Sequence, residues 1–186
     1  MALSALTATL KAFVSFSSTL AGADRPSLKG KDDVQTDAVE KTASLTLGTG
    51  ALQANQLFAD TRTLTSGATE LLNVSGGATG SAVAIKNPHG LTITATKIVA
   101  MAIVNTSLTY GLTIFGQGSA DITSMVKANG DGIIIPPGGM YLIGPATGST
   151  DAVGFVVATD EVLSVAGDGA HTGTYQIAMF LVGTAA

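Results

Sequence analysis

The chain has 186 residues, of which 46% are hydrophobic and 12% are charged, and it contains no cysteine. Its formal net charge is −4 and it has no run of lysine or arginine, which argues against nucleic acid as a direct partner because phosphate binding needs clustered basic side chains. Without cysteine it can form neither disulfides nor cysteine-based zinc sites, and no apolar run approaches the roughly 20 residues of a membrane-spanning helix.

The shortage of charge also predicts the nature of the surface. Average proteins carry about 25% charged residues, twice the share found here, so Thr, Ser, Gly and Ala have to cover much of this protein. Such a surface suits permanent contact with other subunits better than life as a free monomer.

The first third of the chain, residues 1–62, holds more than half of the charged residues. Around Phe13 and Phe16 apolar residues alternate with Ser and Thr, which predicts one or two short strands. The polar stretch Asp24–Lys41 predicts a solvated linker, with a helix at Val34–Lys41 as the alternative. Residues 1–23 lack the basic start and unbroken apolar centre of a signal peptide.

We therefore predict two parts, an extended N-terminal arm with short strands at residues 1–62 and a β-domain at residues 63–186. The arm has too few apolar residues for a core of its own, so those it has must be buried against something else. Phe13, Phe16 and Phe58 are accordingly the candidate assembly contacts.

From Thr63 onward, short runs rich in Thr, Val and Ile alternate with Gly-, Pro- and Asn-containing turns about every ten residues, the spacing of a β-sandwich. No long amphipathic helix and no fixed repeat interrupts this pattern. The expected fold is all-β, an antiparallel two-sheet jelly-roll sandwich. The predicted strands are Thr63–Leu64, Thr69–Val74, Ala82–Ile85, Leu91–Ile93, Ile98–Asn105, Gly111–Phe115, Ile133–Ile135, Met140–Ile143, Val153–Ala158, Val162–Val165 and Thr174–Val182.

The apolar runs also predict which side chains form the core. Each of the following residues lies in such a run and is expected to be buried between the sheets: Ile98, Ile103, Ile114, Ile134, Leu142, Val156, Leu163 and Ile177. The break at Pro136-Pro137-Gly138-Gly139 predicts a sharp turn with a glycine at positive φ that joins two antiparallel strands.

The polar residues do not assemble into a recognisable catalytic or metal site. His89 and His171 lie in separate turns, and a metal site needs more ligands at set spacing. No acid closes a calcium loop after Asp131, and Asp160-Glu161 is best explained as a turn. No nucleophile elbow or phosphate-binding loop is present. The sequence therefore predicts no catalytic residues, no cofactor and no metal.

Four segments carry a resemblance to a known group of proteins: Lys97–Ser107, Ile133–Leu142, Asp160–Val165 and Thr174–Ala185. Together they resemble small jelly-roll structural proteins of tailed bacteriophages, including capsid cement (decoration) proteins. The resemblance covers about residues 60–186 and leaves the N-terminal arm out. It implies a virion component on the outer capsid surface, commonly a homotrimer, that binds the major capsid protein and ties neighbouring capsomers together.

Two other functions compete with this expectation. A phage tail or fibre module could recognise host glycan through loops of the same sandwich, since loops on rigid scaffolds often carry binding sites. Exposed aromatic and acidic residues clustered at one end would favour that function. A hydrolase is the third possibility, and the lack of a catalytic constellation argues against it.

Overall fold

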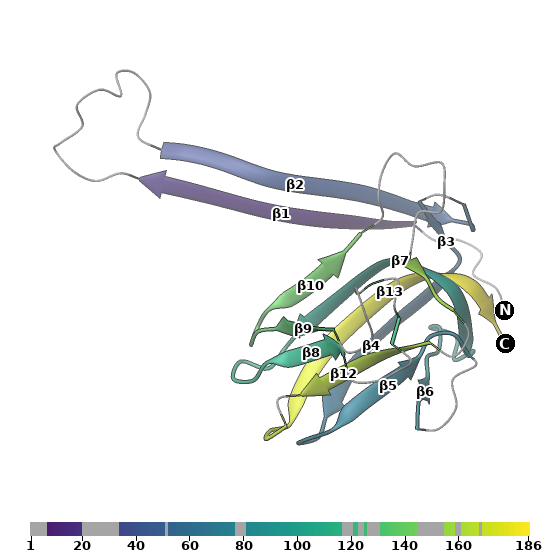
Figure 1. The fold of residues 1–186 in the computed structure, drawn as a ribbon. Coiled ribbons are helices and arrows are strands. Elements are labelled where there is room, and N and C mark those ends of the chain that lie inside the picture. The colour runs from purple at the N-terminus through teal and green to yellow at the C-terminus, as the bar shows by residue number, and fades with distance from the viewer. Residues whose placement is uncertain are drawn as a thin grey trace.

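The computed structural model describes residues 7–19, 34–50, 52–76, 81–116, 121–122, 125, 131–144, 155–158, 161–167 and 169–186, with side chains before Ser44 described only at Thr7 and Thr9. In these residues the fold is all-β, as predicted, and its strands form three sheets (Figure 1). Two of the sheets have five strands each and share one hydrophobic core, in a sandwich-like arrangement. The third is a three-stranded sheet that includes the N-terminal hairpin.

The first large sheet is centred on β13 (Gly173–Ala185) and is called the β13 sheet below. Its strand order is β10 (Met140–Ile143), β7 (Ile93–Asn105), β13 and β4 (Gln56–Leu64), and β11 (Phe155–Val156) also pairs with β7. All of these pairs are antiparallel.

The second large sheet is centred on β12 (Val162–Gly167) and is called the β12 sheet. Its order is β6 (Val83–Ala84), β5 (Thr69–Asn73), β12, β8 (Leu112–Phe115) and β9 (Gly132–Ile135). Only the short β5–β6 pair is parallel. The chain passes repeatedly between the two sheets, because β4, β7, β10 and β13 belong to one and β5, β8, β9 and β12 to the other.

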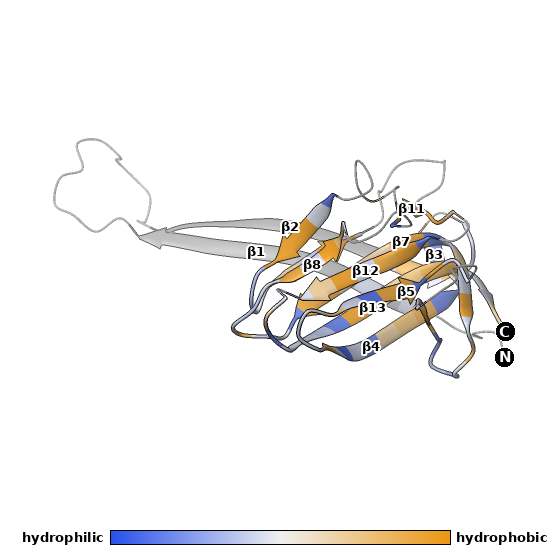
Figure 2. Ribbon diagram, turned by 60° about the horizontal axis from the view of Figure 1, so that its bottom comes forward, coloured by the Kyte–Doolittle hydropathy of each residue, from blue (hydrophilic) through white to orange (hydrophobic). Residues whose placement is uncertain are grey.

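Alternation along the strands builds the core between these sheets. In β13, Tyr175, Ile177, Met179 and Leu181 are buried, whereas Gln176 on the opposite face is exposed. This is the period of two expected of a strand with one face in the core. Hydrophobic residues accordingly follow the strands in Figure 2.

Five of the eight predicted core residues are fully or almost fully buried: Ile98, Ile103, Ile114, Leu163 and Ile177. Two predictions are wrong, since the side chains of Ile134 and Val156 are 73% and 55% exposed. Leu142 is half-buried. In the run of three isoleucines, Ile135 is buried, so Ile134 has to point to the opposite face of β9.

The N-terminal region differs from its prediction. β1 (Thr7–Thr19) and β2 (Val34–Leu47) pair along their whole length, from Thr7 opposite Thr46 to Thr19 opposite Val34. These are long strands instead of short ones, and residues 34–41 are neither linker nor helix. A polar strand forms here because β1 satisfies its backbone hydrogen bonds. Figure 1 shows the hairpin extending well past the sandwich.

The end of β2 continues into the sandwich through β3 (Gln53–Ala54), which pairs parallel with Thr46 and Leu47. β4 follows at once and pairs with β13 from Gln56 to Leu64. The predicted boundary between residues 62 and 63 therefore falls inside β4. Residues 56–62 therefore belong to the β13 sheet, because β4 is one of its strands.

The turn at Pro136–Gly139 has the predicted glycine, with Gly138 at φ 67°. The amide of Gly139 donates to the carbonyl of Pro136 at 2.9 Å, which closes a tight turn. However, the turn does not join two paired strands. β9 before it belongs to the β12 sheet and β10 after it to the β13 sheet, so the turn carries the chain from one sheet to the other.

Candidate interaction surface

The three candidate assembly contacts do not form one surface. Phe58 is 4% exposed and belongs to the hydrophobic core, so it stabilises the sandwich and is not available to another subunit. Phe13 and Phe16 lie in β1, opposite Glu40 and Asp37, and their side chains lie outside the described residues. Being three positions apart, they fall on opposite faces of the ladder.

The base of the hairpin packs against the outer face of the β13 sheet, the face turned away from the core. Leu45 of β2 is fully buried and forms a second apolar cluster with Ala54 of β3 and with Val99, Ala100 and Val182 of the sheet. This cluster explains why Val99 and Ala100 are both buried although neighbouring strand residues point in opposite directions. Ala100 pairs with Phe180 and Ile98 with Leu181, so Val99 is the extra residue of a β-bulge, and the bulge lets Val99 and Ala100 both join the outer cluster.

Asn55, which follows β3, also binds the backbone of β13 and so stabilises the contact between the base of the hairpin and the β13 sheet. Its side-chain amide donates to the carbonyl of Gly183 at 2.9 Å, and the amide of Gly183 donates back to Asn55 Oδ1 at 2.9 Å. A side chain on Gly183 would collide with the carbonyl of Thr94, so the strands approach closely here only because position 183 is glycine.

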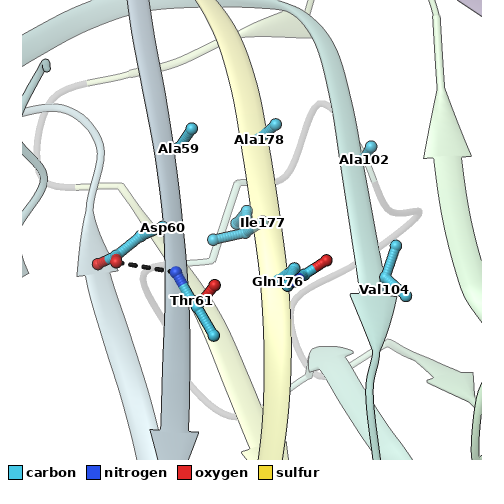
Figure 3. Close-up of a pocket in the computed structure, with 8 residues that line it drawn as sticks. All are labelled: Ala59, Asp60, Thr61, Ala102, Val104, Gln176, Ile177 and Ala178. Atoms are coloured by element: carbon cyan, nitrogen blue, oxygen red, sulfur yellow. Dashed lines mark hydrogen bonds between the residues drawn. The ribbon is translucent and has the colours of Figure 1, made fainter.

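Further along the same outer face, β4, β13 and β7 form an open hollow with a volume of about 610 Å³. Its lining includes Ala59, Ala178 and Ala102, which are register partners across the three strands, and Thr61, Gln176 and Val104 follow in the next register row (Figure 3). Small side chains in adjacent strands leave the sheet surface hollow. Because Asp60 is the one charged residue among those that line it, the hollow suits an apolar partner better than a charged one.

A polar cluster that sequence reasoning missed ties the two large sheets together. Glu70 of β5 accepts hydrogen bonds from Arg62 Nε at 2.8 Å and from the hydroxyl of Tyr175 at 2.6 Å. Arg62 also donates from Nη2 to Glu70 and from Nη1 to Asp60 at 2.7 Å. Tyr175 and Glu70 are 105 residues apart in sequence. The sequence does place charged residues in both strands that flank the turn at Gly67, and this pattern could have indicated the cluster.

The pKa shifts in this cluster are typical of residues that stabilise the fold. Burial raises the pKa of Tyr175 far above its ordinary value of 10.0, and the hydrogen bond to Glu70 raises it further. The pKa of Arg62 is also raised, chiefly by its hydrogen bond to Glu70. The phenol therefore stays protonated and the guanidinium stays charged at neutral pH. Arg62 lies between two acidic partners, and the cluster presents no unpaired base to a substrate.

The two histidines have ordinary surroundings. Both are exposed, and the ring of His171 stacks on the ring of Tyr110 with centroids 3.6 Å apart. The backbone amide of His89 donates to Asn87 Oδ1 in the predicted turn. Glu161 is buried and its Oε2 accepts from the amide of Ala158 at 2.8 Å, which supports the turn interpretation. Asp131 is exposed, whereas Asp160 lies outside the described residues.

Within the described part of the chain, no three His, Asp or Glu residues are grouped so that they could hold a metal ion. In the same residues no helix is long and apolar enough to cross a membrane. Comparison of the chain with protein-family models, with curated proteins and with solved structures found no match in any of the three.

Proposed function

We propose that this protein is a non-enzymatic structural protein that decorates the outer surface of a viral capsid and ties neighbouring capsomers together. The observation that carries the proposal is the β1–β2 hairpin. It extends past the sandwich with its base fixed by Leu45 and Asn55, which is the form of an element that reaches another molecule (Figure 1). An isolated two-stranded ribbon is marginally stable in water, so a partner surface would stabilise it. In this role the hairpin is the N-terminal arm.

The strand order supports a jelly roll. In that fold, eight strands in two Greek keys alternate between two four-stranded sheets. The orders β10-β7-β13-β4 and β5-β12-β8-β9 interleave in this way, with β6 and β11 as short additions. The fold alone does not specify a function, and the capsid role also depends on the resemblance of residues 60–186 to phage cement proteins.

The proposed assembly is a homotrimer bound to the major capsid protein, with the virion as its location. A surface with few charges and a hairpin that extends past the sandwich are both suited to symmetric association. Repeated contacts on a rigid shell act together, because each bound site raises the effective concentration of the next.

The direct test uses shells assembled from the major capsid protein encoded in the same genome. The full chain is expected to cosediment with shells and to appear on their outer surface in electron micrographs. A chain beginning at residue 53, which lacks the hairpin but keeps β3 and β4, is expected to bind much more weakly. No binding of the full chain to the shells contradicts the proposal.

One observation favours the glycan-binding function as a second candidate. Tyr110 and His171 form a stacked aromatic pair in loops, and the nearby Leu108 is 88% exposed. Aromatic faces at loop ends are suited to sugar rings. If Tyr110→Ala abolishes binding to host-cell polysaccharide while shells remain undecorated by the full chain, this second function replaces the first.

A further inference from the structure

We propose that the β1–β2 hairpin of one chain lies across the outer face of the β13 sheet of a second copy of this chain. The surface that receives it is the hollow lined by Ala59, Ala102, Val104, Gln176 and Ala178. This inference rests on the self-association part of the proposed function and is independent of whether the assembly binds a capsid or a glycan.

The register of the hairpin makes one of its faces mostly apolar. Ala8, Leu10, Ala12, Val14 and Phe16 share one face of β1, because alternate residues of a strand lie on the same side. The alternate set on β1, apart from Phe13, consists of Thr, Ser and Lys11. Directly opposed residues of an antiparallel pair also share a face. The first set therefore lies with Leu45, Ala43 and Val39 of β2, and with two charged residues, Lys41 opposite Ala12 and Asp37 opposite Phe16.

The apolar face of the hairpin already makes the proposed kind of contact within its own chain. Leu45 is opposite Ala8 and is buried against Val99, Ala100 and Val182 on the outer face of the β13 sheet. The other residues on this face of the hairpin follow the β1–β2 ladder away from the contact made by Leu45. The rest of that sheet face, from Ala102 and Ala178 onward, forms the open hollow.

The chain's own hairpin is not among the described residues that line the hollow, since all of them belong to β4, β7 and β13. Figure 1 shows the ribbon leaving the sandwich near β3 and running past it. In the described part of the chain nothing from the hairpin occupies the hollow, so each copy can offer the hollow to the hairpin of another copy. Exchange between copies covers both, and exchange around a closed ring leaves none unpaired.

The size of the contact fits a stable assembly. Residues 9–19 of β1 lie beyond the Leu45 contact and span about 37 Å at about 3.4 Å per residue, and a two-stranded ribbon is about 10 Å wide. One face of it covers about 370 Å². Each protomer in a ring donates one hairpin and accepts another and so buries about 740 Å², close to the roughly 800 Å² per partner of a standard interface.

Charge substitution on the sheet face tests the proposal in the full chain. By light scattering after size exclusion, the unsubstituted chain is expected to be an oligomer and Ala178→Arg a monomer. Ile134→Arg is the matched control, because it places the same charge on the outer face of the other sheet, and it is expected to keep the oligomer. A monomeric unsubstituted chain, or a folded Ala178→Arg that keeps the oligomer, overturns the proposal.

Crosslinking identifies the segment that occupies the face, and the absence of native cysteine makes it specific. Chains with Val14→Cys or Phe16→Cys are mixed with differently tagged chains carrying Ala178→Cys, refolded together and oxidised. Disulfides that link the two differently tagged chains are expected for these variants. They are expected to be lost for Ser15→Cys and Ser17→Cys, which lie on the other face of the ladder. Equal crosslinking from both faces overturns the proposal.

A chain carrying both Val14→Cys and Ala178→Cys separates exchange from closure of the hairpin onto its own sandwich. Exchange gives covalent dimers and larger species on a denaturing gel, and these persist on dilution of the assembled oligomer. If the double variant gives only an internally linked monomer and the mixed single variants give no link, the hairpin covers its own sheet and the proposal is wrong.

Discussion

Asn105 is a buried residue whose side chain holds three segments of the chain together. Its Nδ2 lies within hydrogen-bond distance of the carbonyl oxygens of Tyr110 at 2.8 Å, Pro136 at 3.1 Å and Ile135 at 3.2 Å. Its Oδ1 accepts from the amide of Ser107 at 3.1 Å. One amide at the end of β7 therefore supports both the loop after it and the turn that crosses between the sheets.

We predict that Asn105→Ala lowers the free energy of unfolding by about 1–3 kcal/mol, because it removes a buried side-chain donor to three carbonyl groups and the acceptor for the amide of Ser107. Asn105→Asp is expected to cost at least as much, since it places an oxygen against those carbonyls. Urea denaturation measures both changes. Thr184→Ala, at an exposed position in β13, serves as the control and is expected to stay within about 0.5 kcal/mol. An unchanged midpoint for both Asn105 variants would contradict this role.

Tyr175 gives a prediction for alkaline pH. Its folded pKa lies above the ordinary value of 10.0 because of burial and the hydrogen bond to Glu70. Below pH 10 the phenol is protonated in both states and the stabilisation is complete. As the pH rises above 10 the unfolded chain loses the proton more readily, so the folded state loses stability.

Unfolding in urea between pH 8 and pH 11 is expected to show this decline, and Tyr175→Phe is expected to be less stable at pH 8 but to decline less steeply. Burial also raises the pKa of Tyr141, so part of the slope is expected to remain. The same slope in Tyr175→Phe as in the unsubstituted chain would show that Tyr175 does not contribute.

At the scale of the strands, Ile103 and Ile134 show that a residue in an apolar run can be either buried or exposed. Both lie in runs that predict burial, yet Ile103 is fully buried in β7 and Ile134 is mostly exposed in β9. Ile103→Ala is expected to cost about 2–5 kcal/mol through lost burial and the cavity it leaves. Ile134→Ala is expected to change stability by less than about 0.5 kcal/mol.

Thermal and urea unfolding of these two variants decide the register of β9 as well as the core. The removed atoms are identical, so only the environment of the side chain differs. Comparable losses in both would mean that Ile134 faces a packed surface, and the pairing of Ile134 opposite Thr113 would have to be revised.

At the scale of the whole molecule, the sandwich is expected to be independent of the hairpin but not of β4. A chain of residues 53–186 keeps Asn55, Phe58 and Arg62 and should fold, with a lower melting temperature because Val99 and Ala100 lose the cover of Leu45. A chain of residues 63–186 loses all of β4 except Thr63 and Leu64 and should not fold.

Circular dichroism and cooperative thermal unfolding distinguish the two fragments. The shorter one exposes the edge of β13, opens the core at Phe58 and removes Arg62 from Glu70. A cooperative transition in residues 63–186 would mean that β4 is dispensable and that the sandwich begins at the boundary predicted from sequence.

The sequence by itself determined the local features of this protein. Val-, Ile- and Thr-rich runs gave strands, and the turns at Gly76, Gly90, Gly138 and Gly169 each have the positive φ that glycine permits. It also predicted an all-β chain and most of the core, because period and composition depend on neighbouring residues only.

The tertiary structure alone decided which strands pair. Residues 34–41 carry too weak an apolar pattern to predict a strand, and they become one because β1 lies beside them. The break after Ile135 crosses between sheets instead of forming a hairpin. Likewise, Phe58 became a core residue because β4 joins β13, and the hollow at Ala178 exists only where β4, β13 and β7 lie in register. Pairing is a contact between distant segments, and a local pattern cannot specify its partner.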